Sequence, residues 1–158
     1  MYQKILIGID GSEHSYKALL KAIELQKMDE NEIIVFHSVK HHAIPTGEFM
    51  APSISLIPRV YSISSPDIQR IKEVYEKNAQ AIIDRAKKIF MEAGIQIETR
   101  LVFDHDPVSY IKKAVKEEDI DLVIIGSKGI HSFLEEILLG SVAEKVLRHV
   151  DCDILVVK

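Results

Sequence analysis

Residues 122–144 read LVIIGSKGIHSFLEEILLGSVAE, and the rest of the chain is organised around them. The apolar run 122–125 is typical of a buried strand, and the glycine-containing segment 126–129 follows it directly. Ser141 precedes Glu144 by three residues, which is the spacing of a capping box. The stretch therefore predicts a strand, a glycine turn and a helix start in succession.

This succession predicts an anion site. Unpaired backbone N–H groups and the positive end of the helix dipole point to one place, and glycine lets a backbone approach a ligand closely. We expect a phosphate group to bind between segment 126–129 and the helix that begins at Ser141. Plain turn chemistry is the alternative, because glycines at strand ends often serve turns alone.

The remaining chain alternates strands and helices. Apolar or alternating segments predict strands at 4–9, 32–39, 95–101, 122–125 and 154–157. Caps and apolar stripes predict helices after Ser12, from Ser65 to Ala93, after Asp106, and from Ser141 to His149. This order predicts one α/β domain over residues 1–158, with an open five-stranded parallel sheet covered by helices on both faces.

Residues 40–66 interrupt the alternation. They carry four prolines and several serines without a clear period, so we expect a long loop that packs as a flap.

The composition limits the partners that we expect the protein to bind and the cellular compartment in which we expect it. A net charge of −4 argues against nucleic-acid or anionic-membrane binding, and no apolar run is long enough to span a membrane. The single Cys152 cannot form an internal disulfide, and no signal peptide precedes the first strand. We expect a cytoplasmic protein with neither a nucleic-acid nor a membrane partner.

A second half of the anion site follows from topology. Ligands of open α/β sheets bind beyond the carboxyl ends of the strands, where strand order reverses. In the order 3-2-1-4-5, the first and fourth strands are neighbours at that point, and Asp10 ends the first strand. Its carboxylate can accept hydrogen bonds from a ribose hydroxyl or a base amino group. With phosphates at 126–129, the crevice suits a mononucleotide.

These residues resemble the universal stress protein family over essentially the whole chain. Residues 4–12 (KILIGIDGS) resemble its opening strand and Asp-Gly-Ser turn, and segments 126–129, 139–144 and 154–157 resemble its C-terminal signature. The ATP-binding branch carries G-x2-G-x9-G-[ST]. Here residues 130–139 make this spacer one residue longer. We expect a bulge that absorbs the extra residue, or a shifted loop with weaker phosphate binding.

The resemblance implies a Rossmann-like fold of the adenine nucleotide alpha hydrolase type, strand order 3-2-1-4-5, and binding of ATP or AMP. It implies that Asp10 contacts the adenosine and that the backbone near Ser38 contacts the adenine edge. The implied phosphate-binding residues are Gly126, Ser127, Lys128, Gly129, Gly140 and Ser141. Mg²⁺ or Mn²⁺ would be held mainly through the phosphates, and a homodimer would form by antiparallel pairing of strand 154–157.

One further departure from the family concerns His105, which stands where members usually have a glycine before Asp-Pro. Its side chain is expected to crowd or to contact the nucleotide.

Three functions fit these features. The leading hypothesis is a regulatory, stress-response protein that binds ATP and acts through a conformational or partner readout. Slow ATP hydrolysis is second, because Glu135, Glu136 and His131 are the nearby candidates for a general base and none is placed beside the phosphates. The third is an interaction module of the same fold without nucleotide binding, with the flap as its partner surface.

Overall fold

The protein is described by a computed structural model over residues 2–39, 48–50, 60–62, 65–129 and 139–158. In chain order its elements are β1 (Lys4–Gly8), α1 (Glu13–Gln26), β2 (Glu32–Val39), β3 (Glu48–Met50), β4 (Val60–Ser62), α2 (Ser65–Glu92), β5 (Glu98–Phe103), α3 (Pro107–Glu117), β6 (Leu122–Gly126), α4 (Ser141–His149) and β7 (Asp153–Val157). No helix in these ranges is both long and apolar enough to cross a membrane.

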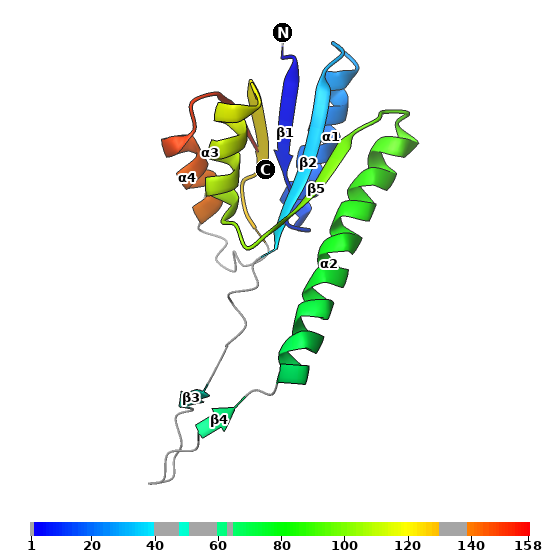
Figure 1. Cartoon of the computed structure of the whole chain (residues 1–158). Coiled ribbons are helices and arrows are strands. Elements are labelled where there is room, and N and C mark those ends of the chain that lie inside the picture. The colour runs from blue at the N-terminus through cyan, green and yellow to red at the C-terminus, as the bar shows by residue number, and fades with distance from the viewer. Residues whose placement is uncertain (1, 40–47, 51–59, 63–64, 130–138) are drawn as a thin grey trace.

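Five of the strands form a parallel sheet in the order β5-β2-β1-β6-β7 (Figure 1). These are the third, second, first, fourth and fifth predicted strands, so the predicted order 3-2-1-4-5 is confirmed. In the central pair Gly8 lies opposite Ile125. β1 and β6 therefore end at the same edge of the sheet, where the order reverses.

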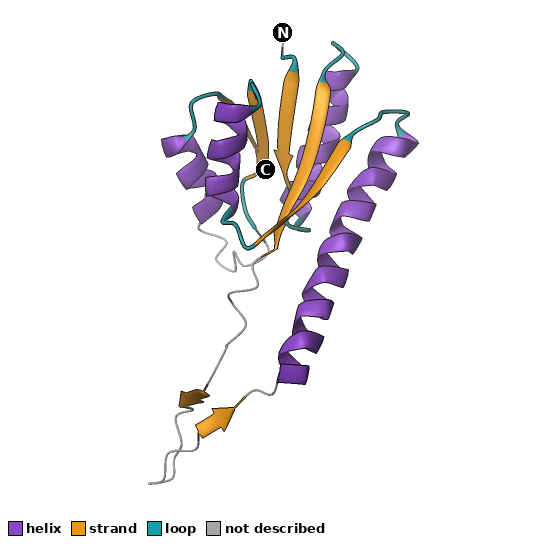
Figure 2. Ribbon diagram, viewed as in Figure 1, coloured by secondary structure: helices purple, strands orange, loops and turns teal. Residues whose placement is uncertain are grey.

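Helices cover both faces of the sheet (Figure 2). On one face α1 and α2 pack against the odd-numbered residues of β1, such as Ile5 and Ile7. On the other, α3 and α4 pack against the alternate residues, such as Leu6 and Val123. Because both faces of each central strand are buried, its sequence is a continuous apolar run rather than an alternating one.

Two of the predicted helix caps are confirmed. Ser12 caps α1 by accepting a hydrogen bond from the Ser15 N–H, and Asp106 caps α3 in the same way from Ser109. The predicted capping box at Ser141 is wrong. The residue at the N-cap of α4 is Gly140, so Ser141 is already inside the helix and no side chain caps its start.

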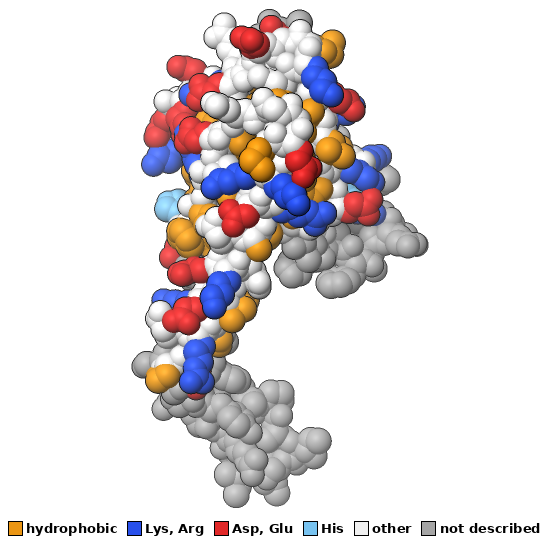
Figure 3. Space-filling model, turned by 90° about the vertical axis from the view of Figure 1, so that its right-hand side faces the viewer, with side chains coloured by type: hydrophobic (Ala, Val, Ile, Leu, Met, Phe, Trp, Pro, Cys, Tyr) orange, Lys and Arg blue, Asp and Glu red, His pale blue; other side chains and the backbone are white. Residues whose placement is uncertain are grey.

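The predicted loop at 40–66 lies largely outside the described residues. Its described parts form a short antiparallel pair, β3 with β4, in which Phe49 lies opposite Tyr61. The sequence pattern did not indicate these strands. β4 is followed closely by α2, whose outer face mixes acidic and basic side chains (Figure 3).

An ion pair fixes β5 to the end of α3. The Arg100 guanidinium donates two hydrogen bonds of 2.8 Å, one to each carboxylate oxygen of Glu118, and a third to Glu98. The hydrogen bonds from Arg100, together with its charge, lower the pKa of Glu118 below its ordinary value.

Candidate functional site

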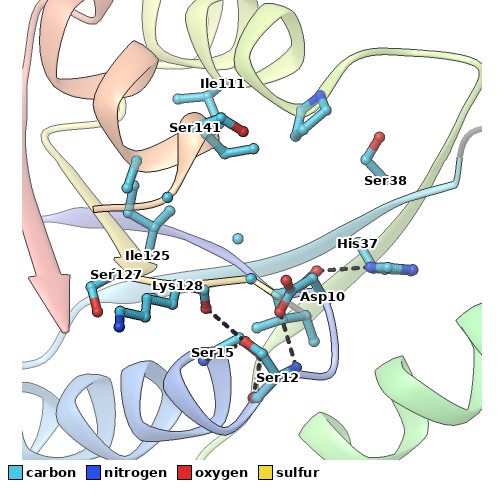
Figure 4. A pocket seen from close by; sticks show the side chains of 18 of the residues that line it. Asp10, Ser12, Ser15, His37, Ser38, Ile111, Ile125, Ser127, Lys128 and Ser141 are labelled. Atoms are coloured by element: carbon cyan, nitrogen blue, oxygen red, sulfur yellow. Dashed lines mark hydrogen bonds between the residues drawn. The ribbon is translucent and has the colours of Figure 1, made fainter. Parts of the chain in front are cut away.

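A cavity of about 280 Å³ opens at the carboxyl edge of the sheet, between the ends of β1 and β6 (Figure 4). All eight residues that the sequence singled out line it: Asp10, Ser38, Gly126, Ser127, Lys128, Gly129, Gly140 and Ser141. Residues from three strands (β1, β2 and β6) and three helices (α1, α3 and α4) meet here because parallel strands deliver their following loops to one edge.

Asp10 lies on the wall formed by the end of β1. The chain turns there through Gly11, whose φ of 86° is one that residues with a side chain rarely adopt. One carboxylate oxygen of Asp10 accepts a hydrogen bond of 3.0 Å from the Ser12 N–H. The other lies 2.8 Å from where a side chain on Gly129 would begin. The carboxylate is therefore held against the glycine segment at the cavity wall.

The glycines of the segment do different things. A Cβ on Gly126 would lie 2.8 Å from backbone atoms of His14 and Ser15, so glycine is required there for β6 to pack on α1. Among the described residues, a Cβ on Gly129 would meet only the Asp10 carboxylate within 4 Å. Gly126 is explained by the fold, whereas Gly129 keeps the cavity wall clear.

The longer spacer does not separate the glycines that flank it. Residues 130–138 lie outside the described ranges, but a Cβ on Gly140 would be 3.6 Å from the Gly129 nitrogen. The Gly140 N–H also donates a 2.7 Å hydrogen bond to the Ser127 carbonyl. Both ends of the spacer therefore meet at the cavity.

The start of α4 is the electropositive wall. The first intrahelical bond runs from the Glu144 N–H to the Gly140 carbonyl, so the N–H groups of Ser141, Val142 and Ala143 have no partner within the helix. All three residues line the cavity, and no side chain caps the helix. Lys128 adds a positive charge to the lining. This arrangement suits a bound anion.

Ser127 is almost fully buried, and each of its polar groups is used within the fold. Its N–H donates to the Val157 carbonyl and its carbonyl accepts from the Gly140 N–H, both at 2.7 Å. Its hydroxyl shares a 2.7 Å hydrogen bond with Nδ1 of His14. Ser127 thus joins β7, α4 and α1 beneath the cavity.

The end of β2 and the first part of α3 add apolar residues to the cavity lining. Sequence reasoning missed most of this lining, which includes Phe36, Pro107 and Ile111. His37 lies there too, and its Nδ1 donates a 2.7 Å hydrogen bond to the Ile9 carbonyl, which leaves Nε2 as an acceptor. The signal that could have found these residues is their position in the chain, because they lie near strand ends or on α3, beside the same edge of the sheet.

Ser38 and His105 meet beside this end. The Ser38 hydroxyl donates to the His105 carbonyl. The His105 ring is exposed, and its Nδ1 donates to the Phe103 carbonyl at 2.9 Å. His105 is not among the residues that line the cavity, so its ring does not crowd it. The left-handed residue of this turn is Asp104, with φ of 55°, so no glycine is needed at position 105.

Comparison with known proteins now assigns the family. The model described as the universal stress protein family matches residues 1–158. The chain belongs to the universal stress protein family. Universal stress protein YxiE of Bacillus subtilis is 32% identical over 158 residues, with all of both chains covered. Universal stress protein MJ0531 of Methanocaldococcus jannaschii is 30% identical, and the match covers all of this chain and 83% of that protein.

Solved structures of other proteins have the same fold. The structure of hypothetical protein MJ0577 has a TM-score of 0.78 and 27% identity, with 100% of this chain and 96% of that chain covered. Complexes with adenine nucleotides occur among other family structures. They include a universal stress protein with cAMP (24% identity, TM-score 0.61, 99% and 96% covered) and one from Archaeoglobus fulgidus with dAMP (21%, 0.60, 99% and 98%). A third, from Arabidopsis thaliana, contains AMP (14%, 0.63, 99% and 91%).

Proposed function

We propose that the cavity binds an adenine nucleotide, ATP or AMP, and that the protein is a nucleotide-dependent regulator of the stress response. The observation that carries the proposal is the pairing of two unlike walls across one cavity. Asp10 presents a carboxylate on one side, and the uncapped start of α4 presents backbone donors on the other. The adenine nucleotides in three related structures support the same choice of ligand.

The phosphate end of the cavity fits an anionic group. Ser141, Val142 and Ala143 supply N–H donors at the positive end of the α4 dipole, and Lys128 supplies charge. Gly129 and Gly140 leave the approach clear of side chains. Gly126 and Ser127 contribute by holding this segment in place.

A divalent cation, Mg²⁺ or Mn²⁺, would be held through the nucleotide phosphates rather than by a protein cluster. Within the described ranges no three His, Cys, Asp or Glu residues gather to hold a metal ion. The nucleoside end is assigned to Asp10 and to the backbone near Ser38, with Ile111 and Pro107 as apolar contacts for the base.

Homodimerisation through β7 is part of the proposal. β7 is an edge strand of the sheet, and its residues Ile154–Val157 are half-buried and uncharged. An edge of this kind presents unpaired backbone groups to a second strand. Antiparallel pairing of two copies would cover it.

The proposal is tested by looking for nucleotide directly. Purified protein is denatured and the supernatant is analysed for adenine nucleotides, and ATP, AMP and GTP are then titrated in a thermal-shift assay. A ligand at about 100 times its Kd stabilises the folded state by about 2.7 kcal/mol, which raises the Tm of a chain of this size by about 5–10 °C. We expect this shift with ATP or AMP but not with GTP. No carried nucleotide and no shift at millimolar ATP would overturn the proposal.

Gly140→Val is the variant that we expect to lose nucleotide binding. The added side chain would enter the space between Ser127, Gly129 and the α4 start, so the ATP-dependent shift should disappear. Lys145→Ala, on an exposed position one turn further along α4, should leave the shift intact. Timed phosphate release from the wild-type protein separates a binder from a slow ATPase.

A further inference from the structure

The first turn of α1 contacts the glycine segment residue by residue. Asp10 lies against Gly129, and the Ser12 hydroxyl donates a 3.2 Å hydrogen bond to the Lys128 carbonyl. Further along, His14 bonds to the Ser127 hydroxyl. Segments 10–15 and 126–129 therefore lie side by side and run in opposite directions.

His14 differs from the other members of this set because it does not line the cavity. Its ring lies outside, half-buried, and reaches Ser127 from the α1 side. The backbone of His14 also forms the surface on which Gly126 packs. His14 therefore contacts the segment from the α1 side, away from the cavity lining.

Ser127 transmits this contact to the cavity. Its carbonyl accepts the Gly140 N–H, and Gly140 is the residue that starts α4. The orientation of Ser127 therefore sets the distance between segment 126–129 and the N–H groups of the α4 start. A buried hydroxyl that loses its partner must rotate or remain unpaired, and either change disturbs this distance.

We propose that His14 is a positioning residue for the nucleotide phosphates. It acts through Ser127, whose hydroxyl is committed to His14 and whose backbone, rather than its side chain, serves the site. The inference rests on the proposed function for its effect on binding. The structural part of the inference is that His14 fixes residues 126–129. This part does not require a ligand and is measured separately.

Four single variants and one double variant test the proposal by isothermal titration with ATP and by amide hydrogen exchange of the ligand-free protein. His14→Ala removes the bond, and Ser127→Ala removes its other partner. His14→Asn keeps an amide group near the position of Nδ1 that can donate or accept. Glu13→Gln changes the same turn at an exposed side chain that pairs with Lys17 and not with the segment.

We expect His14→Ala to weaken ATP binding about threefold to tenfold, the range of one hydrogen bond, and to speed exchange of amides 126–129. The double variant His14→Ala/Ser127→Ala should bind no more weakly than the weaker single variant, since both remove the same interaction. His14→Asn should restore affinity to within about twofold of the wild type, again on the scale of one hydrogen bond. Glu13→Gln should match the wild type.

Unchanged exchange and affinity in His14→Ala would overturn the inference, as would a His14→Asn variant as impaired as His14→Ala. If the wild-type protein binds no ATP, the proposed function fails and the exchange measurement alone decides. Faster exchange of 126–129 in His14→Ala with recovery in His14→Asn then supports the fixing of this segment by His14, and equal exchange refutes it.

Discussion

Asp121 and Asp10 lie at opposite edges of the same two neighbouring strands, β1 and β6. At the amino edge, Asp121 precedes β6, and its two carboxylate oxygens accept the N–H groups of Gln3 and Lys4 at 2.7 and 3.1 Å. At the carboxyl edge, Asp10 follows β1 and lines the cavity beside Gly129. One carboxylate joins the strands, and the other faces the cavity.

The difference comes from what the chain does next at each edge. At the amino edge the backbones of β1 and β6 are already within hydrogen-bond reach, and the Asp121 N–H donates to the Lys4 carbonyl at 3.1 Å. At the carboxyl edge the two chains leave the sheet toward different helices. The space between them becomes the cavity. The role of a carboxylate is therefore set by the edge on which it lies.

Exchanging each aspartate for alanine gives the largest expected effects. Asp10→Ala should raise the Kd for ATP about tenfold to a hundredfold, because a charged hydrogen-bond partner of the nucleoside is lost. Asp121→Ala should leave the Kd unchanged but lower the free energy of unfolding by about 2 kcal/mol, because two backbone donors lose their acceptor. Calorimetric titration and chemical denaturation measure the two quantities. The contrast between Asp10 and Asp121 would be refuted if both variants changed the same one of these two quantities.

The next largest effects are expected from substitutions of two glycines in segment 126–129. Gly126→Ala should reduce the free energy of unfolding by about 1–3 kcal/mol, because the new Cβ meets α1 backbone that cannot move aside cheaply. Among the described residues, the new Cβ of Gly129→Ala meets only the Asp10 carboxylate, which can rotate, and the φ of Gly129 is not left-handed. This substitution should change the stability little and weaken ATP binding about threefold to tenfold by displacing Asp10. Denaturation midpoints that fall equally in both variants would contradict this division.

A third carboxylate, that of Glu118, extends the comparison. Its substitution is expected to have the smallest effect. Arg100 lowers its pKa in the folded state, so the pair stabilises the protein above the ordinary glutamate pKa, and this contribution is lost as the pH falls through the lowered value. Glu118→Gln should be less stable than the wild type by about 1 kcal/mol or less at pH 7. The gap should close below about pH 4. Denaturation curves across this range check the sign, and a gap that widens in acid would refute it.

Much of the fold followed from local chemistry. Apolar runs bounded by caps and glycines located the strands of the parallel sheet, and alternation of strands and helices fixed its layers. The position of Asp10 and segment 126–129 at the ends of strands one and four then placed them at one crevice. All eight predicted residues line the same cavity because that inference depends on topology rather than on side-chain detail.

The remainder depends on contacts between distant segments. A capping box at Ser141 matched a local pattern, but Gly140 holds the N-cap because its N–H is bound to the Ser127 carbonyl. Nothing in the spacing of His14 and Ser127 indicates that their side chains meet across 113 positions of sequence. The apolar lining near Ile111 likewise depends on where α3 settles on the sheet. These features arise from packing, which a single sequence does not specify locally.

The packing of Gly126 on α1 changes how a glycine pattern should be used to sort relatives. A glycine aligned with Gly126 reports that β6 lies against the start of the first helix, so it is expected in members that bind nucleotide and in members that do not. Among the described residues, none places a comparable packing requirement on a glycine aligned with Gly129. Of the two, we expect Gly129 to be the diagnostic position, and a relative with a larger residue there to be the better candidate for a protein without nucleotide binding.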